Sequence, residues 1–170
     1  MSNRAVICNR KRGRDSSSSE DESTEGIIKQ LNSIHFPRKR LREGLEEVVD
    51  EGDHGRAQYT INAKGQREGL YQSYYPNGQL REMANYDNGE RFGLVQQWFS
   101  NGRQFELYTM SFGVRNGAAI TWFSSGMIRC YENYKDGALD GSCVYYNEGG
   151  QKSTERFYSS GTVVKEEYFD

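Results

Sequence analysis

The chain has 170 residues, a hydrophobic content of only 35% and a mean hydropathy of −0.91, which fits one domain with a tail. No stretch approaches the length of a membrane-spanning helix, and the apolar run at residues 5–8 is too short for a signal peptide. We therefore expect a soluble, intracellular protein of the cytoplasm or nucleus, with its three cysteines reduced.

Charge divides the sequence near residue 42. Residues 1–42 hold ten Lys and Arg against five Asp and Glu, a net of +5, whereas the remaining residues hold 12 against 19, a net of −7. Phe36 and Tyr59 are the only aromatic residues that precede residue 67. The N-terminal segment therefore buries too little apolar surface to offset its ordering entropy, and we predict a disordered basic tail over residues 1–42.

The tail contains two basic clusters, at residues 10–14 and 38–42, of the kind found in nuclear import signals and nucleic-acid contacts. No aromatic residue interleaves these clusters, so contact with nucleic acid would be non-specific and salt-sensitive. Between the clusters, three serines have an acidic residue three places on and are candidate sites for an acidophilic kinase: Ser17, Ser18 and Ser19. A plain solvated linker is the alternative interpretation.

One apolar island interrupts the tail. Ile27, Leu31 and Ile34 recur at helical spacing and predict a short helix over residues 27–35. This helix could dock on a partner or fold back to cap the first hairpin, and the sequence favours neither.

Residues 43–66 form a transition to the regular part of the chain. Gly55 and Gly65, with Tyr59 between them, are similar to the second half of a repeat that is one residue short. We interpret this segment as a degenerate first repeat or cap, with a short helix around Leu45–Val49.

Glycine recurs with a 24-residue period from residue 67 onward. Such a period is the mark of a repeat protein, and residues 67–164 therefore comprise four repeats. Three series share it without an insertion: Gly69, Gly93, Gly117 and Gly141; Gly78, Gly102, Gly126 and Gly150; and Gly89, Gly113, Gly137 and Gly161.

Each repeat is predicted to form a β-hairpin. The runs between glycines are rich in Tyr, Trp, Phe, Val and Ile, and Asn77-Gly78, Asn88-Gly89 and Asn101-Gly102 favour tight turns with positive φ. Residues 163–169 add a last half-unit, and the charges of the C-terminal edge, residues 165–170, discourage further strand pairing. The predicted fold is all-β: an elongated single-layer antiparallel meander of eight to ten strands.

Two aromatic rows follow the repeat. We predict that the first row is the core ladder that holds the units together, with a ligand-binding stripe as the alternative. Its members are Tyr74, Trp98, Trp122 and Tyr146. The next position holds Tyr75, Phe99 and Phe123, which strand alternation places on the opposite face as candidates for partner contact.

Arg67, Arg91 and Arg115 predict a basic ladder at one end of the hairpins, which Leu139 ends. Such a ladder can bind carboxylates or acidic head groups. Alternatively, the arginines lie over aromatic rings or are neutralised by the nearby acids Glu68, Asp87 and Glu90. The acidic character of the body favours the second interpretation.

Motifs for catalysis are missing from the sequence. His35 and His54 have no metal-ligand spacing, and neither a nucleophile elbow nor a phosphate-binding loop occurs. Cys130 and Cys143 are interpreted as half-buried thiols, with a disulfide or metal pair as the alternative. We expect no enzymatic activity, no cofactor and no metal site.

The pattern of residues 69–80 and 86–93 resembles the variant MORN repeat: a glycine, an aromatic pair, Asn-Gly, a short strand, a tyrosine and two more glycines. The resemblance covers about residues 55–165. It implies a curved, open β-sheet that serves as a scaffold or docking surface, as in bacterial antitoxin-like proteins and large DNA virus proteins, and some eukaryotic members are linked to phospholipid head groups. Asn147, Gly149 and Leu139 depart from the pattern, so the last unit is the least regular.

Three functions are compatible with these features. The leading hypothesis is a non-enzymatic scaffold for protein–protein interaction, as a structural component of a larger assembly such as a virion. The alternatives are a peripheral membrane adaptor that binds acidic head groups through the arginine ladder, and a nucleic-acid or nuclear protein that acts through its basic tail. Open sheet edges leave the oligomeric state undecided at this stage.

Overall fold

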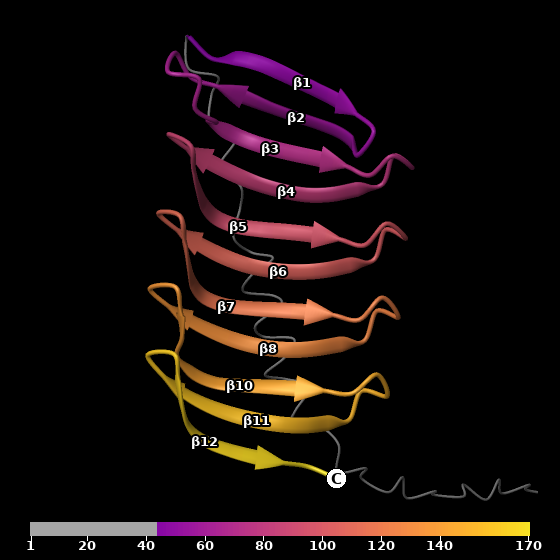
Figure 1. Ribbon diagram of the computed structural model, residues 1–170, viewed down its shortest axis with the longest axis vertical. Coiled ribbons are helices and arrows are strands. Elements are labelled where there is room, and N and C mark those ends of the chain that lie inside the picture. The colour runs from indigo at the N-terminus through magenta and orange to yellow at the C-terminus, as the bar shows by residue number, and fades with distance from the viewer. Residues whose placement is uncertain (1–43) are drawn as a thin grey trace, which may run out of the picture. The chain divides into compact units, whose positions relative to one another are not determined.

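The computed structural model describes residues 44–170 as one open, single-layer sheet of twelve antiparallel strands (Figure 1). Strands β1 to β8 and β10 to β12 follow one another in the sheet in sequence order, β10 pairs with β8, and the short strand β9 also pairs with β8. No helix occurs in the described part of the chain. The predicted meander of tandem hairpins is confirmed. The predictions for residues 1–42, including the helix over residues 27–35 and the phosphorylation of Ser17, Ser18 and Ser19, lie outside the described residues.

The strands exceed the eight to ten expected, because residues 46–52 form a strand instead of a helix and residues 138–139 form a separate short strand. Their bounds are β1 (Glu46–Gly52), β2 (Gly55–Ile61), β3 (Gly69–Tyr74), β4 (Leu80–Asp87), β5 (Glu90–Trp98), β6 (Gln104–Ser111), β7 (Val114–Trp122), β8 (Ile128–Lys135), β9 (Ala138–Leu139), β10 (Gly141–Tyr146), β11 (Lys152–Ser159) and β12 (Thr162–Tyr168).

The helix expected around Leu45–Val49 is wrong, because strand β1 occupies this segment. Val48 lies opposite Tyr59 of β2, and the β-branched residues Val48 and Val49 favour a strand although Leu45 precedes them at helical spacing. Pairing with β2 therefore satisfies the backbone of these residues better than an isolated helical turn would.

Two-residue turns close the hairpins along one edge of the sheet, on the left in Figure 1, which we call the tight-turn edge. Both residues of each turn have positive φ, with values of 46–50° at the first position and 80–87° at the glycine. These values are those of a type I′ turn, whose twist matches the strands it joins. The four turns are Asn88-Gly89, Phe112-Gly113, Asp136-Gly137 and Ser160-Gly161.

Longer turns close the opposite edge, on the right in Figure 1, which we call the wide-turn edge. In the first of these turns, the Gly78 amide donates to the Tyr75 carbonyl and the Tyr75 amide donates to the Gln79 carbonyl. The same two hydrogen bonds recur in the turns that begin at Phe99, Phe123 and Asn147. Only the glycine has positive φ here, so Asn77-Gly78 and Asn101-Gly102 are turns as predicted but not two-residue turns.

Hydrogen bonds between successive tight turns hold the repeats in register. The amide of each turn glycine donates to the carbonyl of the residue 22 positions earlier, as from Gly89 to Arg67 at 2.8 Å and from Gly137 to Arg115 at 2.9 Å. The same contact joins Gly113 to Arg91 and Gly161 to Leu139. Because every unit has the same length, each turn lies directly against the turn before it.

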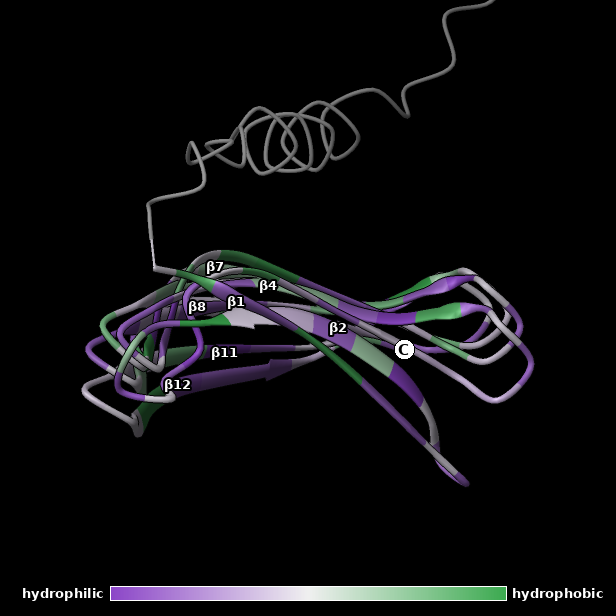
Figure 2. Cartoon of the chain, turned by 90° about the horizontal axis from the view of Figure 1, so that it is seen from above, coloured by the Kyte–Doolittle hydropathy of each residue, from purple (hydrophilic) through white to green (hydrophobic). Residues whose placement is uncertain are grey.

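Burial is greatest on the central strands β4 to β7, on both faces of the sheet. One face carries a buried cluster of Ala84, Tyr86, Val95, Tyr108 and Ala119. Strand alternation places the buried side chains of Leu94, Leu107 and Ile120 on the other face. Figure 2 shows that the strands, viewed along the stack, bow in one direction, so that the sheet has a concave and a convex side.

Candidate interaction surface

The face that carries the buried Tyr86–Tyr108 cluster also carries the arginines of the predicted ladder, and we call it the arginine face. Arg91 lies near the start of β5 and Arg115 near the start of β7, whereas Arg67 precedes β3 and bridges to Ile61. The repeat period puts all three at equivalent positions near the tight-turn edge. They are therefore brought to one side of the sheet, as the sequence predicts.

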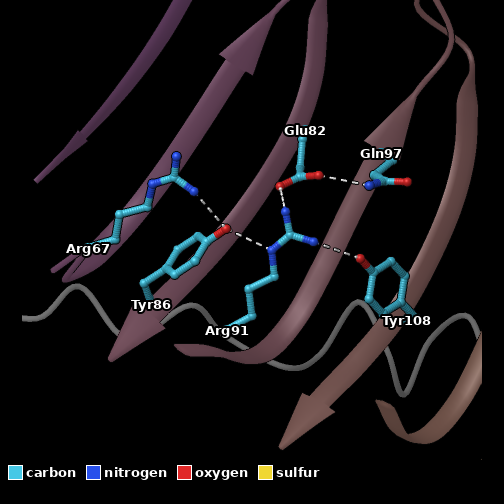
Figure 3. A network of polar contacts seen from close by, with 6 residues as sticks. All are labelled: Arg67, Glu82, Tyr86, Arg91, Gln97 and Tyr108. Carbon is cyan, nitrogen blue, oxygen red and sulfur yellow. Dashed lines mark hydrogen bonds and ion pairs between the residues drawn. The ribbon is translucent and has the colours of Figure 1, made fainter. Parts of the chain in front are cut away.

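Arg91 is the centre of a polar network (Figure 3). Its Nη2 lies 2.6 Å from Oε1 of Glu82, its Nε donates to the Tyr86 hydroxyl at 2.7 Å, and its Nη1 donates to the Tyr108 hydroxyl at 3.3 Å. Gln97 donates to the other oxygen of Glu82 at 2.8 Å. Burial alone would lower the pKa of Arg91, but the contacts with Tyr86 and Glu82 outweigh it and raise that pKa.

Arg115 repeats this arrangement one unit further along. Its Nη2 lies 2.7 Å from Oε1 of Glu106, and its guanidinium lies over the Tyr108 ring at 4.0 Å and the Tyr134 ring at 5.4 Å. Burial raises the pKa of Glu106, and this effect exceeds the lowering by Arg115. For Arg115, burial lowers the pKa, but the contact with Glu106 outweighs burial and the pKa is raised. The balance differs because the carboxylate is the more buried partner. We take the short, direct contact as an ion pair.

The partners of Arg91 and Arg115 are thus Glu82 and Glu106, which lie across the strands instead of beside the arginines in sequence. Sequence analysis did not single out these acids, although a signal was present: Glu82 and Glu106 are themselves one repeat period apart. Both interpretations offered for the ladder, neutralisation and stacking on rings, are combined at these two positions.

Arg67 differs from the other two arginines. Three tyrosine rings surround its guanidinium, with centroids at 4.9 Å for Tyr59, 4.7 Å for Tyr71 and 5.3 Å for Tyr86. Its Nη1 donates to the Tyr86 hydroxyl at 3.3 Å (Figure 3). Within residues 44–170, no carboxylate forms an ion pair with it.

The first aromatic row ends the strands at the wide-turn edge. Tyr74, Trp98, Trp122 and Tyr146 are the last residues of β3, β5, β7 and β10, and each is half-buried. The main burial lies in other residues, because a single-layer sheet buries the middle of its strands more than their ends. The fully buried large side chains are Val95, Leu107, Ile120 and Cys143.

The second row does not follow strand alternation, because Tyr75, Phe99 and Phe123 begin the wide turns after the strands have ended. Tyr75 donates to the Trp98 carbonyl at 2.8 Å, and Phe99 packs against Phe105 with ring centroids 5.0 Å apart. Arginines lie over the other two rings, Arg81 over Tyr75 and Arg129 over Phe123. All three rings are half-buried, so this row helps to join the units.

The tight-turn edge carries an exposed aromatic residue that the sequence analysis missed. Phe112 is 86% exposed and has a φ of 46°, which bulky side chains disfavour. It borders an open depression of about 610 Å³ that is also lined by Phe92, Met110, Asp87 and Glu90. The signal was that the equivalent turn positions hold Asn88, Asp136 and Ser160.

A family comparison explains the architecture. The family described as the MORN repeat variant matches residues 67–88, which run from Arg67 to the first two-residue turn. The same strands, turns and arginine position recur with the repeat period beyond the matched segment. This is a variant MORN-repeat protein. Comparison with curated proteins gives no match to the chain.

MORN repeats are in general motifs of protein and membrane interaction, and the variant MORN family is not typically enzymatic. In the described part of this MORN sheet, no group of three His, Cys, Asp or Glu side chains is placed to hold a metal ion. Cys130 and Cys143 are free and buried. Residues 44–170 also contain no helix long and apolar enough to cross a membrane.

Proposed function

We propose that this MORN protein is a non-enzymatic scaffold that binds another protein, as a structural component of a larger assembly. The observation that carries the proposal is Phe112: a large aromatic side chain held almost fully in solvent on a backbone conformation that it disfavours. Such strain lowers stability and makes no contribution to the sheet, so it is expected where a side chain serves contact with a partner. Phe92 and Met110 in the adjoining depression supply the apolar surface that a partner would cover.

The ion pairs of the arginine face support a protein partner over a membrane. Acidic head groups would need free guanidinium groups in a row, and Arg91 and Arg115 are already paired with Glu82 and Glu106. We therefore place Phe112, which the sequence did not single out, ahead of the partner-contact residues predicted from the sequence. Among those, Arg67 comes before Tyr75, Phe99 and Phe123.

Site-specific photo-cross-linking tests the scaffold function in the full chain. A photoreactive phenylalanine analogue at position 112 should form an adduct with one recurring protein in native extracts. The same analogue at Ser160, an equivalent turn position, should form none. Phe112→Asn should also abolish capture of that protein. Equal adducts at positions 112 and 160 would contradict a specific contact at Phe112.

Two further measurements address the alternative functions. Sedimentation with acidic vesicles should leave the protein in the supernatant, and co-sedimentation that Arg67→Gln abolishes would favour the membrane adaptor. A nucleic-acid role of the tail predicts binding that falls steeply with salt and is lost on deletion of residues 1–42.

A further inference from the structure

The three arginines of the arginine face are equivalent by sequence, but within residues 44–170 only two of them have an acidic partner. In register, Glu82 lies opposite Gln97 and Glu106 opposite Thr121, and both pairs are spaced by one repeat period. The residue one period before Gln97 is Ser73, and Ala57 lies opposite it. Ala57 therefore occupies the place of the acid in the unit of Arg67.

This exchange follows from the connection between β2 and β3, which is one residue longer than the connection between β4 and β5. Gln72 and Gln96 are one repeat period apart, but their partners Gln58 and Met83 are separated by one residue more than that period. Strand β2 is thus shifted by one position relative to β4. The repeat period places Gln58 at the position of Glu82, and the strand register places Ala57 there. Neither side chain is a carboxylate, so Arg67 has no acidic partner on β2.

Arg67 is nevertheless held in place as firmly as its counterparts. Three tyrosine rings surround the guanidinium within 5.3 Å, and the Tyr86 hydroxyl accepts from both Arg67 and Arg91. Stacking of this kind fixes the plane of a guanidinium without using its N–H donors. The remaining N–H groups of Arg67 form the fork that binds a carboxylate through two parallel hydrogen bonds.

Open space lies beside the position of the missing acid. A depression of about 430 Å³ is lined by Ala57, Tyr71 and Ser73, and it continues to Glu82 and Arg91. Charged side chains of both signs border the same depression: Asp50, Asp53, Arg56 and Arg81. A side chain that enters it can bring a carboxylate toward Arg67 from the direction in which Glu82 meets Arg91.

We propose that Arg67, held by Tyr59, Tyr71 and Tyr86, is a carboxylate-binding slot that a glutamate or aspartate side chain of a bound protein completes. The inference rests on the proposed scaffold function, because it names the chemistry of the partner segment. The partner's carboxylate takes the role that Glu82 has for Arg91. An acidic side chain of an extended segment fits the slot, since the depression is open along the sheet.

Arginine side-chain NMR on the full-length protein tests the slot. The probes are a blocked pentapeptide with one central glutamate, the same peptide with glutamine, and inorganic phosphate. The glutamate peptide should shift the Nε–H signal of Arg67 saturably, with a Kd on the order of millimolar for a single contact. The glutamine peptide should leave this signal in place, and the signals of Arg91 and Arg115 should not move.

Variants at position 57 make the test independent of peptide affinity. Ala57→Glu supplies the missing carboxylate within the chain. It should therefore shift the Nε–H signal of Arg67 and weaken binding of the glutamate peptide on the order of tenfold. Ala57→Gln has nearly the same shape without the charge and should leave the Arg67 signal close to that of the original protein. Arg67→Lys keeps the charge but loses the fork, and it should also bind the glutamate peptide more weakly.

Three results would overturn the slot: equal shifts from the two peptides, equal effects of Ala57→Glu and Ala57→Gln, or a response of Arg67 to phosphate alone. The last would mark a general anion site. The scaffold function fails separately, through the cross-linking at Phe112. If capture of the partner protein depends on Phe112 but is unchanged by Ala57→Glu, the slot is excluded and the scaffold function still stands.

Discussion

Burial sets the chemistry of the two cysteines on the sheet. Burial raises the pKa of the Cys130 thiol from 9.0 to about 11, and burial also raises the pKa of Cys143. Because the thiolate is the reactive form, we expect iodoacetamide to label both residues far more slowly at pH 8 in the folded protein than in urea. Peptide mass spectrometry after a timed reaction measures the two rates for each cysteine.

The same shift predicts a pH dependence of stability. The pKa of the Cys130 thiol is higher in the folded protein than in the unfolded chain, so the protonated thiol stabilises the folded state. This stabilisation is complete below about pH 9 and is lost as the pH rises toward 11. Urea unfolding should thus show a declining free energy between pH 9 and pH 11. Cys130→Ser serves as the control, since it should flatten the decline. An unchanged slope in this variant would assign the effect to other groups.

At the scale of single residues, the sequence predicted where the arginines lie but did not predict which side chains they contact. The repeat period placed Arg67, Arg91 and Arg115 on one edge correctly. Their partners depend on which residues lie opposite one another across the strands, and on β2 neither Ala57, which lies opposite Ser73, nor Gln58 is an acid. Gln58, one period before Glu82, already marks the missing acid in the sequence, but the pairing that puts Ala57 in its place became visible only in the structure.

Among the turns, Phe112 has the side chain least suited to its backbone conformation. Phe112→Asn should stabilise the protein by about 1 kcal/mol, because asparagine tolerates positive φ at the first position of a type I′ turn. Urea unfolding of the full chain measures the difference. The reverse exchange, Asn88→Phe, should destabilise by a similar amount. A loss of stability in Phe112→Asn would mean that the ring contributes to the fold.

Gly55 and Gly93 both have positive φ but differ in the space around them. A Cβ on Gly55 would overlap the carbonyl oxygen of Tyr74, whereas a Cβ on Gly93 would meet no atom within 4 Å. Gly93→Ala should cost about 1 kcal/mol from backbone strain alone, and Gly55→Ala about 3 kcal/mol because the first hairpin must also move. Thermal unfolding of the two variants measures both losses of stability. Equal losses would show that the overlap with Tyr74 is relieved at little cost in free energy.

At the scale of elements, the hairpins were predictable wherever glycine and asparagine marked the turns. Asn88-Gly89 is a two-residue turn as expected, and the glycine series located the turn at Phe112-Gly113 although phenylalanine is not a turn residue. Strand β1 was mistaken for a short helix because it has few apolar residues and relies on β2 for its structure. An element that is stabilised by its neighbour carries little evidence in its own residues.

The whole sheet has two exposed ends and a buried middle. All seven residues of β12 and six of the seven in β1 are exposed, whereas the central strands carry the buried side chains. Each unit contacts only its neighbours, so opening should begin at the ends. Hydrogen exchange followed by mass spectrometry should find the fastest exchange in β1 and β12 and the slowest in β4–β7. Uniform protection along the sheet would contradict this gradient.

At this scale the sequence was sufficient for the architecture, since period, strand composition and turn residues agreed on one stacked meander. The surface that carries function was harder to predict. The sequence shows which side chains repeat, but a candidate site here arises where the repetition fails, at Phe112 among turn residues and at Ala57 among acids.

The glycine-to-carbonyl hydrogen bonds between successive tight turns are the same in every repeat, so the sheet can change its length by whole repeats. A segment of one full period, such as residues 91–114, can be removed or duplicated while every remaining turn still meets an equivalent one. Each such step moves the C-terminal edge relative to Arg67 by two strand spacings, roughly 10 Å. The number of repeats therefore sets how far apart two binding partners are held.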